Sequence, residues 1–285
     1  MRSSPNRCFH CGVAEPLRLS QHWRRLLVEP ERLAACAGQL TLSAAESHYL
    51  RRVLRLRSGD RLALIDGCGG LWSARLVAAT GAASEVVAAL EQPLAQPLQR
   101  QPAPSPLIAL AVALPRQDPD VLLRMVCELG IDRIVTLQAA RSVPAARFKS
   151  GRAESILREA AEQCERLWLP SLAADQPAST WLAGAEADAS AAAAGLPSGL
   201  KLLATTRHQG LPSLLDRLGE ATGAERPSSV WVAVGPEGGW SPAEEGCAQA
   251  AGWSPVSLGE TILRTSTAAV TAAAHLAAWR RCRSV

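Results

Sequence analysis

Between Leu107 and the C-terminus, short apolar segments alternate with helix signals. The first segment, Leu107–Leu114, is continuously apolar, as expected for a strand whose sheet is covered on both faces. Further strand-like segments are Ile134–Leu137, Leu200–Ala204 and Val230–Val234. Helices between consecutive strands favour parallel pairing, because the chain must return to the same edge of the sheet. This part of the chain is therefore predicted to be a largely parallel α/β domain.

Capping residues indicate where the helices of this domain begin and end. Asp118 and Pro119 supply an N-cap and a first-turn proline, and Gly130 is suited to close the helix. A second helix is expected from about Arg152 to Trp168, just before Pro170. Its apolar ridge is Ile156, Ala160, Cys164 and Leu167, and its polar ridge is Glu159, Gln163 and Arg166.

The first 106 residues have a different pattern. Residues 1–23 show no periodicity and are expected to be an extension without a fold of its own, and hence dispensable. Residues 24–92 are predicted to form a small β-rich domain, with strand-like alternation at Leu62/Leu64 and at Trp72/Ala74/Leu76. The Pro- and Gln-rich residues 93–106 indicate a linker, and residues 107–285 form the α/β domain.

One basic helix stands out in the small domain. Ser43 and Glu46 have the spacing of a capping box, in which each side chain bonds the backbone of the other. We expect an apolar face with Leu50, Val53 and Leu54, and arginines at positions 51, 52 and 55 off that face. Taken singly, each of these arginines also fits an ordinary solvated charge.

Bulk properties limit the classes of protein that the chain can be. Its 285 residues suffice for two compact domains, and the net charge of +4 argues only weakly for an anionic partner. Lys149 and Lys201 are the only lysines, so arginine, which suits forked contacts with phosphates and bases, carries nearly all the positive charge. The sequence has neither a signal-peptide pattern nor an apolar run long enough to span a bilayer. A cytoplasmic protein with no membrane partner is expected.

The cysteines suggest a reducing compartment rather than a disulfide framework. The eight are scattered, and several fall inside apolar helical patterns, where a thiol behaves as a small hydrophobe. Cys8, His10 and Cys11 resemble half of a zinc site, but no second Cys/His pair follows at suitable spacing. We therefore expect no bound metal. A zinc site formed by this extension stays open as an alternative.

Two glycine-containing segments are candidate ligand sites. In Val230–Glu244 an apolar strand runs into Gly235-Pro236-Glu237-Gly238-Gly239, and a helix capped by Ser241 and Glu244 follows. Glycines at the carboxyl end of a strand let a ligand approach the backbone, although a plain tight turn fits this pattern as well. In Val256–Thr267 a short strand ends at Gly259, a loop carries Arg264, and an Ala-rich helix begins near Ser266. Its small residues suit close packing against another subunit or simply against the sheet.

These two segments together resemble one known family. Gly235–Gly239, followed by Leu258-Gly259 and Ile262-Leu263-Arg264-Thr265, strongly resembles the 16S ribosomal RNA uridine N3-methyltransferases, the RsmE family of SPOUT enzymes. The resemblance extends to Glu128–Gly130, to Arg141–Val143, to Glu159–Arg166 and to His48–Asp60, in the same order along the chain. It covers nearly everything from about residue 24 onward.

The resemblance implies a PUA-like β-barrel followed by an α/β domain with a deep trefoil knot, which periodicity could not reveal. It also implies S-adenosylmethionine as cofactor, small-subunit ribosomal RNA or the 30S subunit as partner, and a homodimer with the site near the subunit interface. The cofactor is expected among three loops, 204–206, 235–239 and 258–263. The residues assigned to it are Ala204, Thr205, Gly235, Pro236, Gly238, Leu258, Gly259, Ile262 and Leu263.

The chemistry of N3 methylation suggests roles for two side chains. The weakly acidic N3 proton must leave, and Glu237 is the candidate acceptor, although it also fits a cofactor-orienting group or a brace for the turn. Arg264 is the candidate that stabilises the anion developing on the base. The candidate RNA contacts are Arg51, Arg52, Arg55, Arg141, Gln163 and Arg166.

Three positions depart from the family pattern. The family usually has Lys where Met125 stands, and Glu where Ala140 and Ser266 stand, and the loop Pro115–Pro119 is one residue shorter. These changes remove or move polar groups on the RNA side and leave the cofactor loops intact. Two alternatives to an active ribosomal RNA methyltransferase therefore stay open: a catalytically weak or inactive RNA-binding or assembly protein, and a related enzyme acting on transfer RNA.

Overall fold

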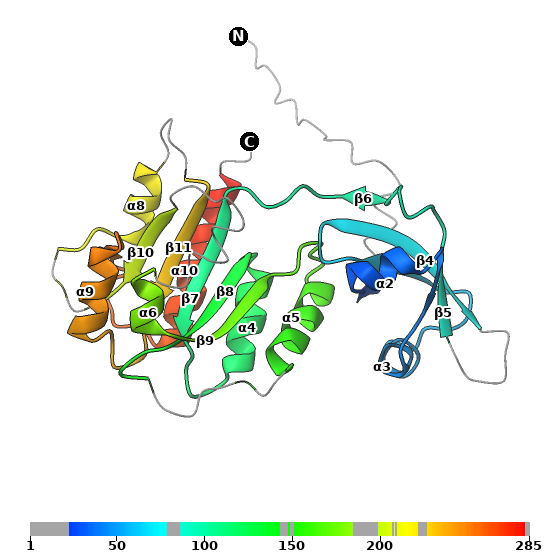
Figure 1. The fold of residues 1–285 in the computed structure, drawn as a ribbon, viewed down its shortest axis with the longest axis horizontal. Helices are drawn as coiled ribbons and strands as arrows, with labels where there is room; N and C mark the ends of the chain where they lie inside the picture. Colours follow the sequence, from blue (N-terminus) through cyan, green and yellow to red (C-terminus); the bar gives the residue numbers. More distant parts are fainter. Residues whose placement is uncertain are drawn as a thin grey trace, which may run out of the picture. The chain divides into compact units, whose positions relative to one another are not determined.

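A computed structural model gives the fold of the chain (Figure 1). It describes residues 23–78, 86–142, 148, 151–184, 199–206, 208, 210–221 and 227–282. The chain divides into two compact units, with the boundary between Pro102 and Ala103. Among the described helices, none is long and apolar enough to cross a membrane.

The N-terminal unit is built on a mostly antiparallel sheet with the strand order β1-β3-β4-β5-β2, and β6 pairs with β4. The predicted alternation is confirmed, because Leu62 pairs with Ala74 and Leu64 with Trp72, and all four side chains are buried. The helix α2 (Pro30–Ala35) inserts Leu33 into the same core. The strands are β1 (Arg25–Leu27), β2 (Gln39–Thr41), β3 (Arg61–Ile65), β4 (Gly70–Ala78), β5 (Val86–Leu90) and β6 (Gln99–Arg100).

The basic helix of this unit is two short helices in succession, α3 (Ala44–His48) and the π-helix η1 (Tyr49–Val53). The capping box of Ser43 and Glu46 is confirmed in both directions. Leu50 is buried, but Val53 is 58% exposed, so its predicted place on the apolar face is wrong. The wider π-helical turn changes the angle between successive side chains, and an α-helical period therefore misplaces residues beyond it.

The C-terminal unit contains a six-stranded sheet in the order β12-β10-β11-β7-β8-β9, and every neighbouring pair is parallel. This arrangement confirms the predicted α/β class of this part of the chain. The carboxyl ends of β12, β10 and β11 lie next to one another at one edge of the sheet. The strands are β7 (Leu107–Ala113), β8 (Arg133–Gln138), β9 (Ser171–Pro177), β10 (Leu200–Ala204), β11 (Ser229–Val234) and β12 (Ser254–Val256).

Helices pack on both faces of this sheet, and this explains why its strands are apolar without alternation. The helix α10 (Thr265–Arg281) contacts β7, β11, α8 (Leu214–Glu220) and α4 (Pro119–Glu128), and α4 packs on α5 (Arg152–Gln163). A separate apolar cluster joins the sheet to α6 (Ala178–Leu182) and α9 (Pro242–Ala250), which contact each other.

One helix limit and one helix cap differ from the expected ones. Helix α5 ends at Gln163 rather than near Trp168, because Glu165 adopts a positive φ of 64° and turns the chain out of the helix. Asp118 stands at the N-cap of α4 as predicted, but its left-handed backbone carries no side-chain capping bond.

The Ala-rich face of α10 is used within the chain. Ala268, Ala269, Ala272 and Ala273 are buried, in a helix that contacts β7 and β11. Of the two interpretations of these small residues, packing against the sheet therefore accounts for these four.

Candidate functional site

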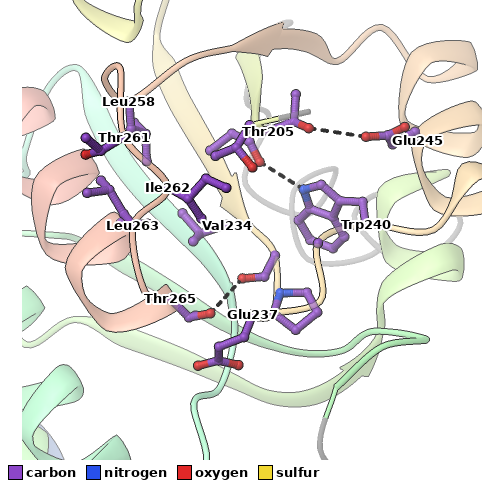
Figure 2. A pocket seen from close by; sticks show the side chains of 16 residues that line it. Thr205, Val234, Glu237, Trp240, Glu245, Leu258, Thr261, Ile262, Leu263 and Thr265 are labelled. Atoms are coloured by element: carbon purple, nitrogen blue, oxygen red, sulfur yellow. Dashed lines mark hydrogen bonds between the residues drawn. The ribbon is translucent and has the colours of Figure 1, made fainter. Parts of the chain in front are cut away.

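Three loops form one pocket at the carboxyl edge of the parallel sheet (Figure 2). They follow β10, β11 and β12, and contribute residues 204–206, residues 234–240 except Gly238, and Leu258 with residues 261–263. Because these three strands are adjacent and parallel, their carboxyl ends deliver the loops to the same place. The space between the loops is about 740 Å³ when its open mouth is included.

Trp240 and Thr265 hold the glycine-rich turn from inside. The indole N–H of Trp240 donates to the Ala204 carbonyl oxygen at 3.0 Å, which ties the loop after β11 to the end of β10. A Cβ at Gly235 would lie 3.0 Å from the Trp240 ring, so glycine lets the ring pack closely against the turn. The buried Thr265 hydroxyl donates to the Gly235 carbonyl oxygen at 3.1 Å and links the turn to the start of α10.

Arg141 and Glu244 hold the same turn from outside. Arg141 Nη1 donates to the carbonyl oxygens of Gly238 at 3.1 Å and Trp240 at 3.0 Å. A Cβ at Gly238 would lie 2.9 Å from Arg141 Cβ, so the two backbones can approach only because Gly238 has no side chain. Glu244 is 3% exposed; it closes the predicted capping box with Ser241 and also accepts the Ala140 backbone N–H at 2.8 Å. These hydrogen bonds thus connect the segment after β8 to the glycine-rich turn of the pocket.

The loop after β12 presents apolar side chains to the pocket. The Ser257 hydroxyl donates to the Gly259 carbonyl oxygen at 2.8 Å and accepts the Gly259 N–H at 3.2 Å, which shapes the start of the loop. Ile262 lines the pocket and is 81% exposed, more than any other exposed large hydrophobic side chain of the described residues. Together with Leu258 and Leu263, Ile262 gives the pocket an apolar wall, which suits a ligand with an apolar surface.

Most of the residues assigned to the cofactor from sequence lie together here. Gly238 and Gly259 do not line the pocket; Gly238 faces Arg141 instead. Glu237 lines the pocket and is exposed. Arg264 is the N-cap residue of α10 and exposed; it directly follows the lining residue Leu263 but does not line the pocket itself. The assigned residues that do line it are Ala204, Thr205, Gly235, Pro236, Leu258, Ile262 and Leu263.

The six residues assigned to RNA have different surroundings. Arg51, Arg52 and Arg55 are exposed on the N-terminal unit, and Gln163 is exposed at the end of α5. Arg166 has a structural role, because its side chain is only 13% exposed and pairs with Asp132. The same guanidinium also donates to the carbonyl oxygens of Cys127, Ile131 and Trp168.

Several pocket residues received no role from sequence. Trp240 and Thr265 belong to the recognised motifs, but their inward hydrogen bonds depend on contacts between distant segments. Glu245 lines the pocket, yet in sequence it is only a second acidic residue in the first turn of α9. The sequence feature that could have marked Glu245 as a pocket residue is its position directly after the capping Glu244.

No group of three or more His, Cys, Asp or Glu side chains that could hold a metal ion occurs among the residues that the structure describes. The half zinc site at Cys8, His10 and Cys11, like the rest of residues 1–22, lies outside the described residues.

Comparisons with known proteins identify matches over both units. A family model described as an RNA methyltransferase domain matches residues 102–277, and one described as an RNA methyltransferase PUA domain matches residues 42–86. Ribosomal RNA small subunit methyltransferase E of Synechocystis is 36% identical over 254 residues, which are 88% of this chain and 76% of that protein. The protein of the same name in Mycobacterium bovis is 31% identical, over 80% of this chain and 81% of its own length.

Solved structures agree with these sequence relatives. A ribosomal RNA small subunit methyltransferase E of Neisseria gonorrhoeae, bound to S-adenosylmethionine, is 27% identical with a TM-score of 0.69; the match covers 90% of this chain and 97% of that one. A methyltransferase of Legionella pneumophila in complex with the same cofactor is 25% identical with a TM-score of 0.70, over 90% and 97% of the two chains.

Proposed function

The chain belongs to the ribosomal RNA small subunit methyltransferase E family, and on this premise we propose that it methylates N3 of a uridine in small-subunit ribosomal RNA, with S-adenosylmethionine as methyl donor. The observation that carries the proposal is the convergence of the loops at 204–206, 235–239 and 258–263 in one pocket. The SPOUT fold class with an N-terminal PUA-like domain agrees with this function.

The residues that line the pocket fit S-adenosylmethionine in polarity. Leu258, Ile262 and Leu263 offer apolar contacts suited to an adenine ring. Glu237 and Glu245 supply negative charge for a ligand with a cationic sulfonium group. These residues, with the backbone of the Gly235–Gly239 turn, would hold the cofactor.

The catalytic roles that we assign are a proton acceptor and an anion stabiliser. When bound, the cofactor supplies a methyl group that its sulfonium charge makes electrophilic. Glu237 accepts the uridine N3 proton, and its exposed carboxylate at the pocket gives it access to a base brought there. Arg264 projects from the N-terminus of α10, where its guanidinium stabilises negative charge on the uracil.

We propose that RNA is held by Arg51, Arg52 and Arg55 of the N-terminal unit and by Gln163 of the C-terminal unit. All four side chains are exposed, and phosphate contacts by arginine give RNA affinity that falls steeply with salt. We leave Arg166 out of this set because its donors bond within the chain. Arg141 is likewise reassigned to the support of the pocket.

We also propose that the enzyme acts as a homodimer in the cytoplasm, where ribosomal subunits are assembled. Within α10, Ala274 and Ala277 stay partly exposed after the other alanines pack inward, and a second copy could approach there. Light scattering at micromolar concentration should give twice the mass of the 30.1 kDa chain, and a monomeric mass would contradict the dimer.

The test is methyl transfer by the purified chain from radiolabelled S-adenosylmethionine to three separate RNA acceptors. These are unmethylated 30S subunits, a naked 16S ribosomal RNA transcript and bulk transfer RNA. We expect label in ribosomal RNA only. Label confined to transfer RNA would favour the transfer RNA enzyme. Binding of 30S subunits without any transfer would favour the non-catalytic protein that Met125, Ala140 and Ser266 leave open.

A further inference from the structure

Glu245 places a carboxylate on the pocket wall. It stands in the first turn of α9, and Figure 2 shows its side chain directed toward Thr205. The Thr205 hydroxyl donates to Glu245 Oε1 at 3.3 Å, and His208 Nε2 lies 3.3 Å from the same oxygen. Thr205 is 8% exposed, and the Glu245 side chain is 28% exposed. The carboxylate is therefore held in place and only partly screened by water.

The charge of the pocket lining is entirely negative. Among the described residues that line the pocket, Glu237 and Glu245 are the ionisable side chains, and no lysine, arginine or histidine is present. Two arginines adjoin the Glu237 side, since Arg141 bonds Gly238 and Arg264 follows Leu263. Glu245 lies on the opposite side of the pocket in Figure 2, with the exposed His208 beside it. Glu245 thus makes its side of the pocket selective for positive charge.

We propose that Glu245 is a specificity residue, which makes the pocket bind the methyl donor more tightly than the demethylated product. The inference rests on the proposed function. S-adenosylmethionine carries a net charge of about +1, because its sulfonium adds to a cancelling ammonium–carboxylate pair, whereas S-adenosylhomocysteine has no sulfonium and is neutral overall. A fixed carboxylate therefore attracts the donor and gains nothing from the product. The spent cofactor is then readily displaced, and the pocket refills with donor between turnovers.

Electrostatics give the size of the preference. Two unit charges about 8 Å apart, at an effective dielectric constant of about 40, attract by an energy equivalent to about a sixfold change in affinity. The contribution of Glu245 should therefore lie at roughly fivefold to tenfold. Since partly exposed charges are screened by ions, the preference should shrink as salt rises.

The test compares calorimetric affinities of the full chain for S-adenosylmethionine and S-adenosylhomocysteine. Glu245→Gln keeps the side-chain size and an oxygen that can accept from Thr205, and removes the charge. It should weaken donor binding by roughly fivefold to tenfold and leave product binding within about twofold. Glu245→Asp should keep most of the preference. Glu220→Gln is the matched control, because Glu220 is 62% exposed on α8 and does not line the pocket.

The outcomes separate this inference from the proposed function. If Glu245→Gln weakens both ligands equally, the carboxylate contacts a group that they share, and the charge selectivity is refuted. An unchanged ratio in folded protein, checked by circular dichroism, also refutes it. If the unaltered chain binds neither compound, the proposed function fails first, and the inference falls with it.

Discussion

The replacement Arg141→Ala tests how the pocket is held open for its ligand. Alanine keeps the Cβ that packs on Gly238 and removes the methylene groups and the guanidinium beyond it. The resulting loss of stability of the turn reports mainly the two hydrogen bonds to Gly238 and Trp240. A hydrogen bond from a charged donor is worth about 1.5–3 kcal/mol when buried. Arg141 is exposed, so we discount the pair to about 1–2 kcal/mol in total.

This energy should appear mainly as lost cofactor affinity. Without these bonds the Gly235–Gly239 turn is less ordered in the free protein, and cofactor binding has to order it. A cost of 1–2 kcal/mol for this ordering lowers cofactor affinity by about 5- to 30-fold. Calorimetry with S-adenosylmethionine measures the change directly. Arg152→Ala is a suitable control, since Arg152 pairs with Asp120 at 2.7 Å on the exposed surface of α4 and α5. Cofactor affinity of the control should stay within twofold.

The opposite result would restore the role indicated by sequence. If Arg141→Ala leaves cofactor binding unchanged and weakens binding of 16S ribosomal RNA, Arg141 contacts RNA, and its bonds to the turn are incidental. Filter binding of RNA at several salt concentrations makes this comparison, because a lost phosphate contact lowers the salt slope by about 1.

Three further predictions concern other residues of the C-terminal unit. Arg264→Ala should lower the single-turnover methylation rate by about a hundredfold or more with cofactor affinity nearly unchanged; a parallel fall in affinity and melting temperature would make Arg264 a loop brace. Thr265→Val should lower the free energy of unfolding in urea by about 1–3 kcal/mol, because the Gly235 carbonyl loses a buried donor, whereas Thr265→Ser should restore it. A hydrogen bond with Cys127, aided by the charge of Arg166, lowers the pKa of Cys164 below the ordinary thiol value. Iodoacetamide should therefore alkylate Cys164 at a lower pH than Cys68, whose pKa is raised by burial, and the reverse order in peptide mass spectrometry would contradict this assignment.

Local patterns in the sequence were enough for the framework of the C-terminal unit. The apolar runs at Leu107, Ile134, Leu200 and Val230 are all strands of the parallel sheet, because such runs can be buried on both faces only there. Capping boxes at Ser43 and Ser241 form as their spacing predicts, since both partners lie within four residues of chain. The strand β9 gave no such signal, because Ser171–Pro177 lacks a continuous apolar run.

Side-chain partners between distant segments could not be read from sequence. Arg141 and Arg166 look alike as exposed cations in a linear pattern, yet both donate to backbone carbonyls of other segments. Glu245 reaches Thr205 only after β10 and α9 have been placed beside each other by the sheet. The resemblance to a known family located the pocket loops, but the bonds that shape them depend on the three-dimensional packing of this chain.

The central claim is that the chain places a methyl group on N3 of a uridine in small-subunit ribosomal RNA. It is tested most directly by nucleoside mass spectrometry of 16S ribosomal RNA, digested after incubation of unmethylated 30S subunits with the protein and S-adenosylmethionine. The account predicts one new species, 3-methyluridine, approaching one per RNA molecule and absent without cofactor. A methyl group on any other nucleoside, or no new methylated nucleoside at all, would contradict it.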